Sequence, residues 1–190
     1  MTTKAAKLAL RREAAARLRA MGPAEREAAS AQARQLLASR PEWRAAESVL
    51  FYAPMAGELD VWPLLGEALA AGRRVGLPRF DPATGAYLAC EVRDPALDLA
   101  RGHFGIREPA ARCPAFSLKW LDLILVPGVA FDPHGRRLGR GKGYYDQLLA
   151  GLRGVMCGVA FDQQIAREVP VSPHDVRMNC ILTPTRWIGL

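Results

Sequence analysis

The sequence predicts a single α/β domain in which a three-layer arrangement places helices on both faces of an open, mainly parallel sheet. Short apolar runs alternate with helical segments along most of the chain, a pattern typical of βαβ units. The runs at 48–53 and 73–77 flank one helical segment, which predicts two parallel strands. Polar or glycine-rich residues follow the runs at 48–53 and 121–126, and ligands of open α/β sheets bind at such strand ends.

The elements follow in order from an alanine-rich helix predicted over 3–21, where Thr2 or Thr3 provides the cap and Gly22 and Pro23 end it. Residues 94–104 are expected to be irregular apart from one helical turn. The remaining elements are predicted as helices at 23–38, 41–46, 60–72 (capped by Asp60) and 144–152, and as strands at 48–53, 73–77 (ended by Pro78), 87–92, 121–126, 155–161, 169–171 and 180–183, with 187–188 beside the last strand.

The net charge of +7 is concentrated at the start of the 190-residue chain. Residues 1–46 hold ten Lys+Arg and four Asp+Glu, whereas the rest of the chain holds sixteen and fifteen. We expect residues 1–46 to form a basic helical arm packed on an α/β core at 47–190. The charge suits a polyanion such as a nucleotide, a polyglutamate tail or a nucleic acid, although most of these arginines are interpreted as a solvated helix face.

Several classes of protein are excluded by composition. The chain has no apolar run of membrane-spanning length, and its N-terminus lacks the apolar stretch of a secretory signal. The four cysteines are widely separated and form no CxxC motif, so we expect free thiols in a reducing cytoplasm and no zinc site. Aromatic residues are not interleaved with the basic ones, which argues against a nucleic-acid partner. We expect a cytoplasmic monomer with neither a membrane nor a nucleic-acid partner.

A glycine-rich segment after the apolar run at 121–126 is the strongest functional pattern. Gly139, Gly141 and Gly143 alternate with Arg140 and Lys142, and a helix is predicted to begin just after them. Glycines let backbone N–H groups approach an anion, so this spacing favours phosphate binding over a flexible basic loop. The segment is not a Walker A loop, because glycine and tyrosine follow the lysine instead of serine or threonine, and it lacks the third glycine of the dinucleotide fingerprint.

This segment also carries a family resemblance. The run RLGRGKGYYD at 137–146, preceded by PGVAFD at 127–132, resembles the signature of 5-formyltetrahydrofolate cyclo-ligase, also called 5,10-methenyltetrahydrofolate synthetase. The run KLALR at 7–11 is similar to the family's N-terminal Lys-x-x-Leu-Arg, and His174 and Asp175 are similar to its C-terminal His-Asp. The resemblance implies a Rossmann-like sheet of the kind found in sugar-phosphate isomerases and CoA-transferase-like proteins.

The resemblance further implies a C–N bond-forming ligase of one-carbon metabolism. Its substrates would be ATP and 5-formyltetrahydrofolate, with or without a polyglutamate tail, and its products 5,10-methenyltetrahydrofolate, ADP and phosphate, with Mg²⁺ as cofactor. Arg140 and Lys142 would be catalytic. The other implied roles are ATP binding by Lys7, Arg11, Arg137, Leu138, Gly139, Arg140, Gly141, Lys142, Gly143, Tyr144 and Tyr145, folate binding by Met55, Glu58, Arg140 and Tyr144, and Mg²⁺ binding by Asp146 and Asn179.

Bland alternatives stand beside some of these roles. Glu58 is also a common kind of helix-start carboxylate, Tyr145 fits a core position, and Arg107 is interpreted as a surface arginine. The sequence departs from the family at Asn179, where the family has an aspartate four positions after the His-Asp, and at Pro184 in place of a glutamate. The loss of one negative charge is expected to weaken Mg²⁺ binding.

Three alternative functions therefore stay open. One is a non-catalytic or altered paralogue that binds folate or nucleotide, which the change at Asn179 favours. The second is an enzyme of the sugar-phosphate isomerase or CoA-transferase type, against which the KLALR run and the glycine-rich segment argue. The third is a nucleic-acid-binding module built on the basic N-terminal helices, which lacks a recognisable reading motif.

Overall fold

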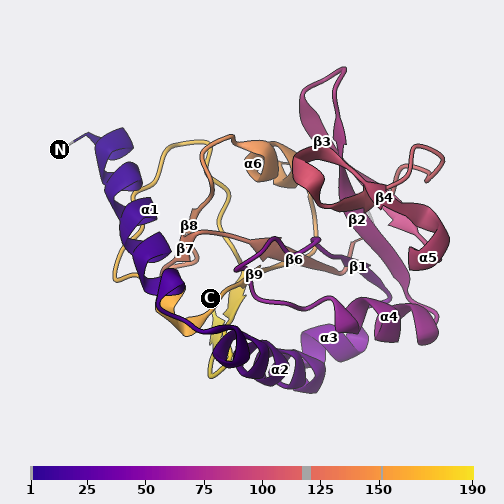
Figure 1. Cartoon of the computed structure of the whole chain (residues 1–190), viewed down its shortest axis with the longest axis horizontal. Helices are drawn as coiled ribbons and strands as arrows, with labels where there is room; N and C mark the ends of the chain where they lie inside the picture. Colours follow the sequence, from indigo (N-terminus) through magenta and orange to yellow (C-terminus); the bar gives the residue numbers. More distant parts are fainter. Residues whose placement is uncertain (1, 117–120, 151) are drawn as a thin grey trace.

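The computed structural model describes residues 2–116, 121–150 and 152–190. Its main sheet has seven strands in the order β11-β10-β9-β6-β1-β2-β3 (Figure 1). The five inner strands are parallel and both edge strands pair antiparallel, which confirms the predicted mainly parallel sheet. The strands are β1 (Ser48–Leu50), β2 (Arg74–Asp81), β3 (Ala86–Val92), β6 (Leu123–Pro127), β9 (Val155–Val159), β10 (Cys180–Leu182) and β11 (Trp187–Gly189).

The strand order reverses direction between β1 and β6. From β1 the chain passes to β2 on one side, then returns to β6 on the other side of β1 and continues outward through β9 to β10. Such a reversal leaves the loops after the two central strands pointing apart, which opens a crevice at their carboxyl ends. The topology alone therefore places the expected ligand site after β1 and β6.

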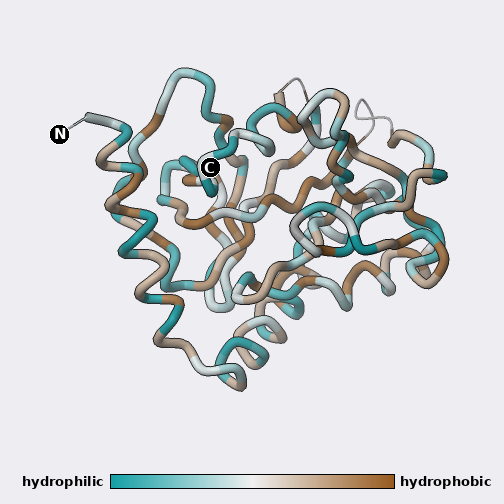
Figure 2. The backbone as a smooth tube through the Cα atoms, turned by 45° about the horizontal axis from the view of Figure 1, so that its top comes forward, coloured by the Kyte–Doolittle hydropathy of each residue, from teal (hydrophilic) through white to brown (hydrophobic). Residues whose placement is uncertain are grey.

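Helices cover both faces of this sheet, as predicted. Alternate residues of β6 point to opposite faces: Leu123 and Leu125 belong to one apolar cluster, and Ile124 and Val126 to the other. This strand is buried on both sides, which explains its uninterrupted apolar sequence (Figure 2). The first face is covered by α2 (Pro23–Ser39), α3 (Pro41–Ala45) and α4 (Pro63–Ala70), and the second by α6 (Tyr144–Leu149).

Helix α1 (Thr3–Arg19) lies apart from these layers, at the side of the molecule (Figure 1). Its buried Ala14 packs with Ala130 and Leu138 of a small hairpin, β7 (Ala130–Phe131) and β8 (Arg137–Leu138). In contrast, α2 and α3 contribute to the main apolar cluster on the sheet. The division into a 1–46 arm and a 47–190 core stays a prediction, and the contacts give the first helix of that arm a role of its own.

Three boundaries differ from the sequence predictions. Strand β2 continues through Pro78 instead of ending there, because residue 78 faces the side of β1 beyond Gly76, where the pairing with β1 has ended and no N–H is needed. Helix α4 begins at Pro63 and not at Asp60, whose Oδ1 accepts a hydrogen bond from the Trp62 N–H in the turn before the helix. Residues 169–171 form no strand.

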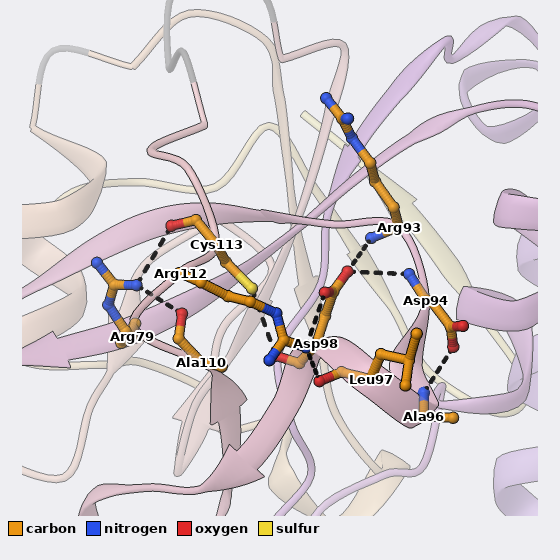
Figure 3. A network of polar contacts seen from close by, with 9 residues as sticks. All are labelled: Arg79, Arg93, Asp94, Ala96, Leu97, Asp98, Ala110, Arg112 and Cys113. Carbon is orange, nitrogen blue, oxygen red and sulfur yellow. Dashed lines mark hydrogen bonds and ion pairs between the residues drawn. The ribbon is translucent and has the colours of Figure 1, made fainter.

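The segment between β3 and β6 is more ordered than expected. It contains the predicted helical turn, α5 (Pro95–Asp98), and an unpredicted hairpin of β4 (Leu99–Arg101) and β5 (Arg107–Pro109). The Asp98 carboxylate accepts hydrogen bonds from the Arg93 and Asp94 N–H groups at 2.8 and 3.0 Å and pairs with Arg112 (Figure 3). Arg79 of β2 donates to the Ala110 and Cys113 carbonyls. These contacts fix the hairpin against the sheet.

Two expectations from composition are also met. All four cysteines are buried free thiols. None of the helices that the structure describes combines the length and hydrophobicity needed to cross a membrane.

Candidate active site

A cavity of about 890 Å³ opens at the carboxyl ends of β1 and β6, where the strand order reverses. Three segments that are distant in the sequence meet around it: helix α1, the loop after β1, and the glycine-rich segment after β8. The residues that matter below are Lys7, Arg11, Met55, Glu58, Tyr87, Arg107, all of 137–146, Ser172 and Asp175.

The glycines of the glycine-rich segment have conformational reasons to be there. Gly141 and Gly143 have φ angles of 101° and 72°, a region that other residues adopt only with strain. Gly143 is also the N-cap of α6. Between them, Lys142 is exposed and lines the cavity, and it forms no ion pair with any residue in the described parts of the chain. The segment thus presents backbone and an uncompensated cation to the cavity.

Arg137 is used inside the protein. Its side chain is 3% exposed, and its Nη2 donates to Asp146 Oδ1 at 2.6 Å. It also donates to the Pro127 carbonyl at 3.4 Å and lies 5.8 Å from the centre of the Tyr145 ring. The arginine therefore orients Asp146 at the edge of the cavity and ties α6 to the end of β6.

Glu58 joins the loop after β1 to the glycine-rich segment. Its Oε2 accepts the Met55 N–H at 3.0 Å, which closes a turn, and its Oε1 accepts Arg140 Nη2 at 2.9 Å. Glu58 is 13% exposed and Arg140 57% exposed. This ion pair lies across the cavity wall and is accessible to a ligand on the Arg140 side.

Helix α1 places two cations at the cavity, one turn apart. Lys7 Nζ contacts Asp175 Oδ2 at 2.6 Å and Ser172 Oγ at 2.9 Å. Arg11 Nε donates to the Gly139 carbonyl at 2.9 Å. Burial favours a higher pKa for Asp175, but the hydrogen bonds from Lys7 and from the Ser172 N–H outweigh it, so the pKa of this carboxyl lies below its ordinary value.

Aromatic rings form the wall near β2 and β3. The Tyr144 ring lies 5.3 Å from Tyr87 and 5.5 Å from Phe80, both in edge-on arrangements. Burial and the nearby carboxylate of Glu108 raise the pKa of Tyr87 to about 12. Burial likewise raises the pKa of Tyr145 well above its ordinary value. These phenols are neutral at physiological pH and offer flat apolar surface with polar tips.

Comparison with known proteins identifies the family. The family model for 5-formyltetrahydrofolate cyclo-ligases matches residues 3–184. The chain belongs to the 5-formyltetrahydrofolate cyclo-ligase family. The cyclo-ligase of Escherichia coli K12 is 31% identical over 90% of this chain and 96% of its own length, and that of Mycolicibacterium smegmatis is 38% identical over 74% and 75%.

A solved structure agrees with this assignment. The NMR structure of 5,10-methenyltetrahydrofolate synthetase from Aquifex aeolicus superposes with a TM-score of 0.87 and is 33% identical, covering 97% of this chain and 92% of that one. The α/β fold with its mainly parallel sheet is therefore a cyclo-ligase family fold, as the sequence resemblance implied.

The structure brings nearly all of the sequence-predicted site residues to one cavity. Every candidate ATP-binding and folate-binding residue lines it, as does Asp146. Asn179 is the exception, and its assignment as a metal ligand is wrong for this structure. It lies at the amino end of β10, at the edge of the sheet away from the cavity, and its Oδ1 accepts the Met156 N–H at 2.8 Å. The amide has a structural role in joining β9 to β10.

The sequence assigned no role to several residues that line the cavity. Asp175 was noted only as part of the His-Asp resemblance, which could have identified it as a site carboxylate. Tyr87 had no signal, because its position depends on β2 continuing past Pro78 to pair with β3. Arg107, interpreted as a surface arginine, is exposed but lines the cavity, with its guanidinium 3.9 Å from the centre of the Trp62 ring.

Proposed function

We propose that this protein catalyses the ATP-dependent cyclisation of 5-formyltetrahydrofolate to 5,10-methenyltetrahydrofolate, with release of ADP and phosphate. The observation that carries the proposal is the meeting of the α1 cations, the glycine-rich segment and Glu58 around one cavity. Members of the family carry the names of this activity. The cavity also has a volume within the range of sites for small-molecule ligands.

The chemistry needs an activated oxygen. The formyl group on N5 is an amide whose oxygen is a poor leaving group. Transfer of the terminal phosphoryl group of ATP to that oxygen makes it a good one. N10 then attacks the formyl carbon, the five-membered ring closes, the N10 proton is lost, and phosphate leaves with the former formyl oxygen. Such catalysis consists mainly of positioning and charge neutralisation.

The glycine-rich segment and α1 are the proposed ATP-binding parts. Backbone N–H groups of residues 139–143 would contact the phosphates, and Lys142 would offset charge that grows on the transferred group. Lys7 and Arg11 would approach the phosphates from the opposite side. Lys7 would have to exchange its contact with Asp175 for the nucleotide, whereas Arg11 already lies against the segment through Gly139. Arg137 would act through Asp146, because its guanidinium is occupied within the protein.

The loop after β1 and the aromatic wall are the proposed folate-binding parts. Met55 and Glu58 would contact the pterin, and Tyr144 would stack on it, since flat neutral rings suit an aromatic heterocycle. Arg140 would contact both substrates, because it lies at the boundary between the glycine-rich segment and Glu58. This division leaves the reacting formyl group between Arg140 and Lys142.

The donor set fits Mg²⁺. The carboxylates of Asp146 and Asp175 both line the cavity, and carboxylate oxygens are preferred Mg²⁺ ligands. Among the described residues no group of three or more His, Cys, Asp or Glu clusters in metal-binding geometry, which agrees with an ion that takes its other ligands from phosphate and water. We propose Asp146 and Asp175 as its protein ligands. The ion would neutralise phosphate charge, and its position is expected to depend on Arg137, which holds Asp146.

Partners and location follow from the same proposal. The substrates are small molecules, and no nucleic acid or membrane is required. Buried free thiols favour a reducing compartment such as the cytoplasm. We expect a monomer, because all the proposed binding groups come from one chain. A non-catalytic role was favoured by the change at residue 179, and that argument lapses because Asn179 lies away from the cavity.

A direct assay tests the proposal. Purified protein mixed with 5-formyltetrahydrofolate, ATP and Mg²⁺ should give rising absorbance at the methenyl band, and omission of ATP should abolish the rise. Folate binding without any ATP-dependent product would contradict the proposed activity and leave a binding protein.

A further inference from the structure

A second, smaller cavity of about 490 Å³ lies beside the first and has no role in the function proposed above. It is bounded by the C-terminal half of α1, by the start of α2, and by the loops after β1 and β6. Four arginines and one carboxylate line it: Arg11, Arg19, Arg26, Arg140 and Glu58.

The charges around this cavity do not balance. Glu58 pairs with Arg140, but Arg11, Arg19 and Arg26 form no ion pair with any residue of 2–116, 121–150 or 152–190. Arg26 is partly buried, and its Nε is inaccessible to solvent and has no hydrogen-bond partner there. Like charges around a small, partly enclosed space repel each other at a cost in stability. An anion in the cavity would relieve that repulsion.

The two cavities are continuous at a defined boundary. They share Arg11, Glu58, Gly128 and Arg140. The Glu58–Arg140 pair therefore separates them, and a ligand seated against this pair in the larger cavity has a path into the smaller one. Lys7, Lys142 and the three alternating glycines line only the larger cavity. The proposed phosphate-binding groups thus leave the smaller cavity to a different anionic group.

We propose that the smaller cavity is an anion subsite in which Arg19 and Arg26 bind carboxylates of a γ-glutamyl tail on the folate. The inference rests on the proposed function. A glutamyl tail is an extended chain with one carboxylate for each added residue, and charge-assisted bonds from arginine suit such groups. Inorganic phosphate shares this chemistry and is the second possible source of the anion, although the favoured occupant is the tail because Glu58 and Arg140 are proposed folate contacts.

The test compares tail lengths by direct binding, in the absence of ATP. Dissociation constants are measured for 5-formyltetrahydrofolate with one glutamate and with five, using wild type and the double variant R19Q/R26Q. The control is R12Q/R153Q, which removes the same charge from exposed arginines that line neither cavity. The charge-retaining variant R19K/R26K and a thermal melt of each protein separate loss of charge from loss of fold.

We expect wild type and the control to bind the pentaglutamate at least about tenfold more tightly than the monoglutamate, and R19Q/R26Q to reduce this ratio to about one. R19K/R26K should keep most of it. An equal ratio in wild type and R19Q/R26Q, whatever its value, would overturn the assignment of the tail to this cavity.

A second arm identifies the other source of the anion. The dissociation constant of inorganic phosphate is measured for the same proteins. Weakening by about tenfold in R19Q/R26Q alone, with no tail-length effect, would assign the subsite to phosphate. No weakening of either anion would overturn the subsite altogether. If wild type bound no folate and made no methenyl product, the proposed function would fail, and the phosphate arm would still decide whether the smaller cavity binds anions.

Discussion

Two acid–base pairs in this protein involve arginines only four residues apart, yet they do different things. Arg136 contacts Asp132 at 2.6 Å, and Arg140 contacts Glu58 at 2.9 Å. The first pair is buried, with Asp132 fully inaccessible, whereas Arg140 is 57% exposed at a cavity. The distances are similar, so burial and the remaining partners decide which pair maintains the fold and which is available to a ligand.

The partners of Asp132 are all internal. Besides the Arg136 side chain, its two oxygens accept hydrogen bonds from the backbone N–H groups of His134, Arg136 and Val169. These bonds join the β7–β8 turn to the segment after β9, and β8 carries the chain into the glycine-rich segment. Glu58 spends one oxygen on its own loop and the other on Arg140, a bond that a ligand can replace.

The largest expected effect comes from Asp132→Ala. Removing one partner of a buried pair leaves the other charge and several N–H groups without an acceptor, so we expect a loss of about 3–5 kcal/mol of unfolding free energy. Urea denaturation followed by circular dichroism measures it. Glu58→Ala is the matched variant from the exposed pair, with an expected change below about 1 kcal/mol. Equal losses in the two variants would remove the distinction between the pairs.

Lys142→Ala extends the comparison to a cation that pairs with no other described residue. Because no described contact is lost, stability should change by less than about 0.5 kcal/mol. Turnover should fall by about a hundredfold or more, since the residue is proposed to offset charge on the transferred phosphoryl group. The methenyl absorbance assay measures the rate. Arg12→Ala, on an exposed position of α1 outside both cavities, is the control and should keep the wild-type rate. A near-normal rate in Lys142→Ala would reduce the lysine to a surface residue of the loop.

Glu58→Gln sharpens the functional side of the comparison. The change removes a charge while keeping the shape, so the Met55 turn should survive and stability should change by less than about 1 kcal/mol. The KM for 5-formyltetrahydrofolate should rise about tenfold, because a charge-assisted contact becomes a neutral one. The KM for ATP should be unchanged. A rise confined to ATP would place Glu58 on the nucleotide side of the cavity.

The smallest effect is expected at Asp98, a surface carboxylate that resembles Asp132 in accepting backbone bonds. Bonds from the Asp94 and Arg93 N–H groups hold its pKa below the ordinary value. A carboxyl with a lowered folded-state pKa stabilises the protein above the unfolded pKa of about 4 and loses that contribution as pH falls through the folded pKa. Wild type should therefore be more stable than Asp98→Asn at pH 7, and the gap should narrow toward pH 3. A constant gap would show that titration of Asp98 is not linked to folding.

Much of this could be predicted from sequence where the signal is local. The alternating glycines and cations at 139–143 and the paired cations of α1 are contiguous patterns, and the structure brings both to one cavity. The parallel sheet follows from the alternation of apolar runs and helices. The prediction succeeded because each pattern is set by backbone geometry or by the spacing along one element.

Residues whose role depends on distant packing were predicted less well. Asn179 was assigned to the metal from its distance after His174 and Asp175, but only the register of β10 decides which edge of the sheet it reaches. Asp175, four residues earlier, lines the cavity instead. Arg137 carries the same charge as Arg140, and the sequence alone does not reveal that its guanidinium turns inward to Asp146.

The most direct test of the central claim follows the formyl oxygen itself. The protein is given 5-formyltetrahydrofolate labelled with ¹⁸O in the formyl group, together with unlabelled ATP and Mg²⁺, and the released phosphate is analysed by mass spectrometry. Transfer of the terminal phosphoryl group to that oxygen predicts one ¹⁸O in each phosphate formed with methenyl product. Methenyl product accompanied by unlabelled phosphate would contradict the account.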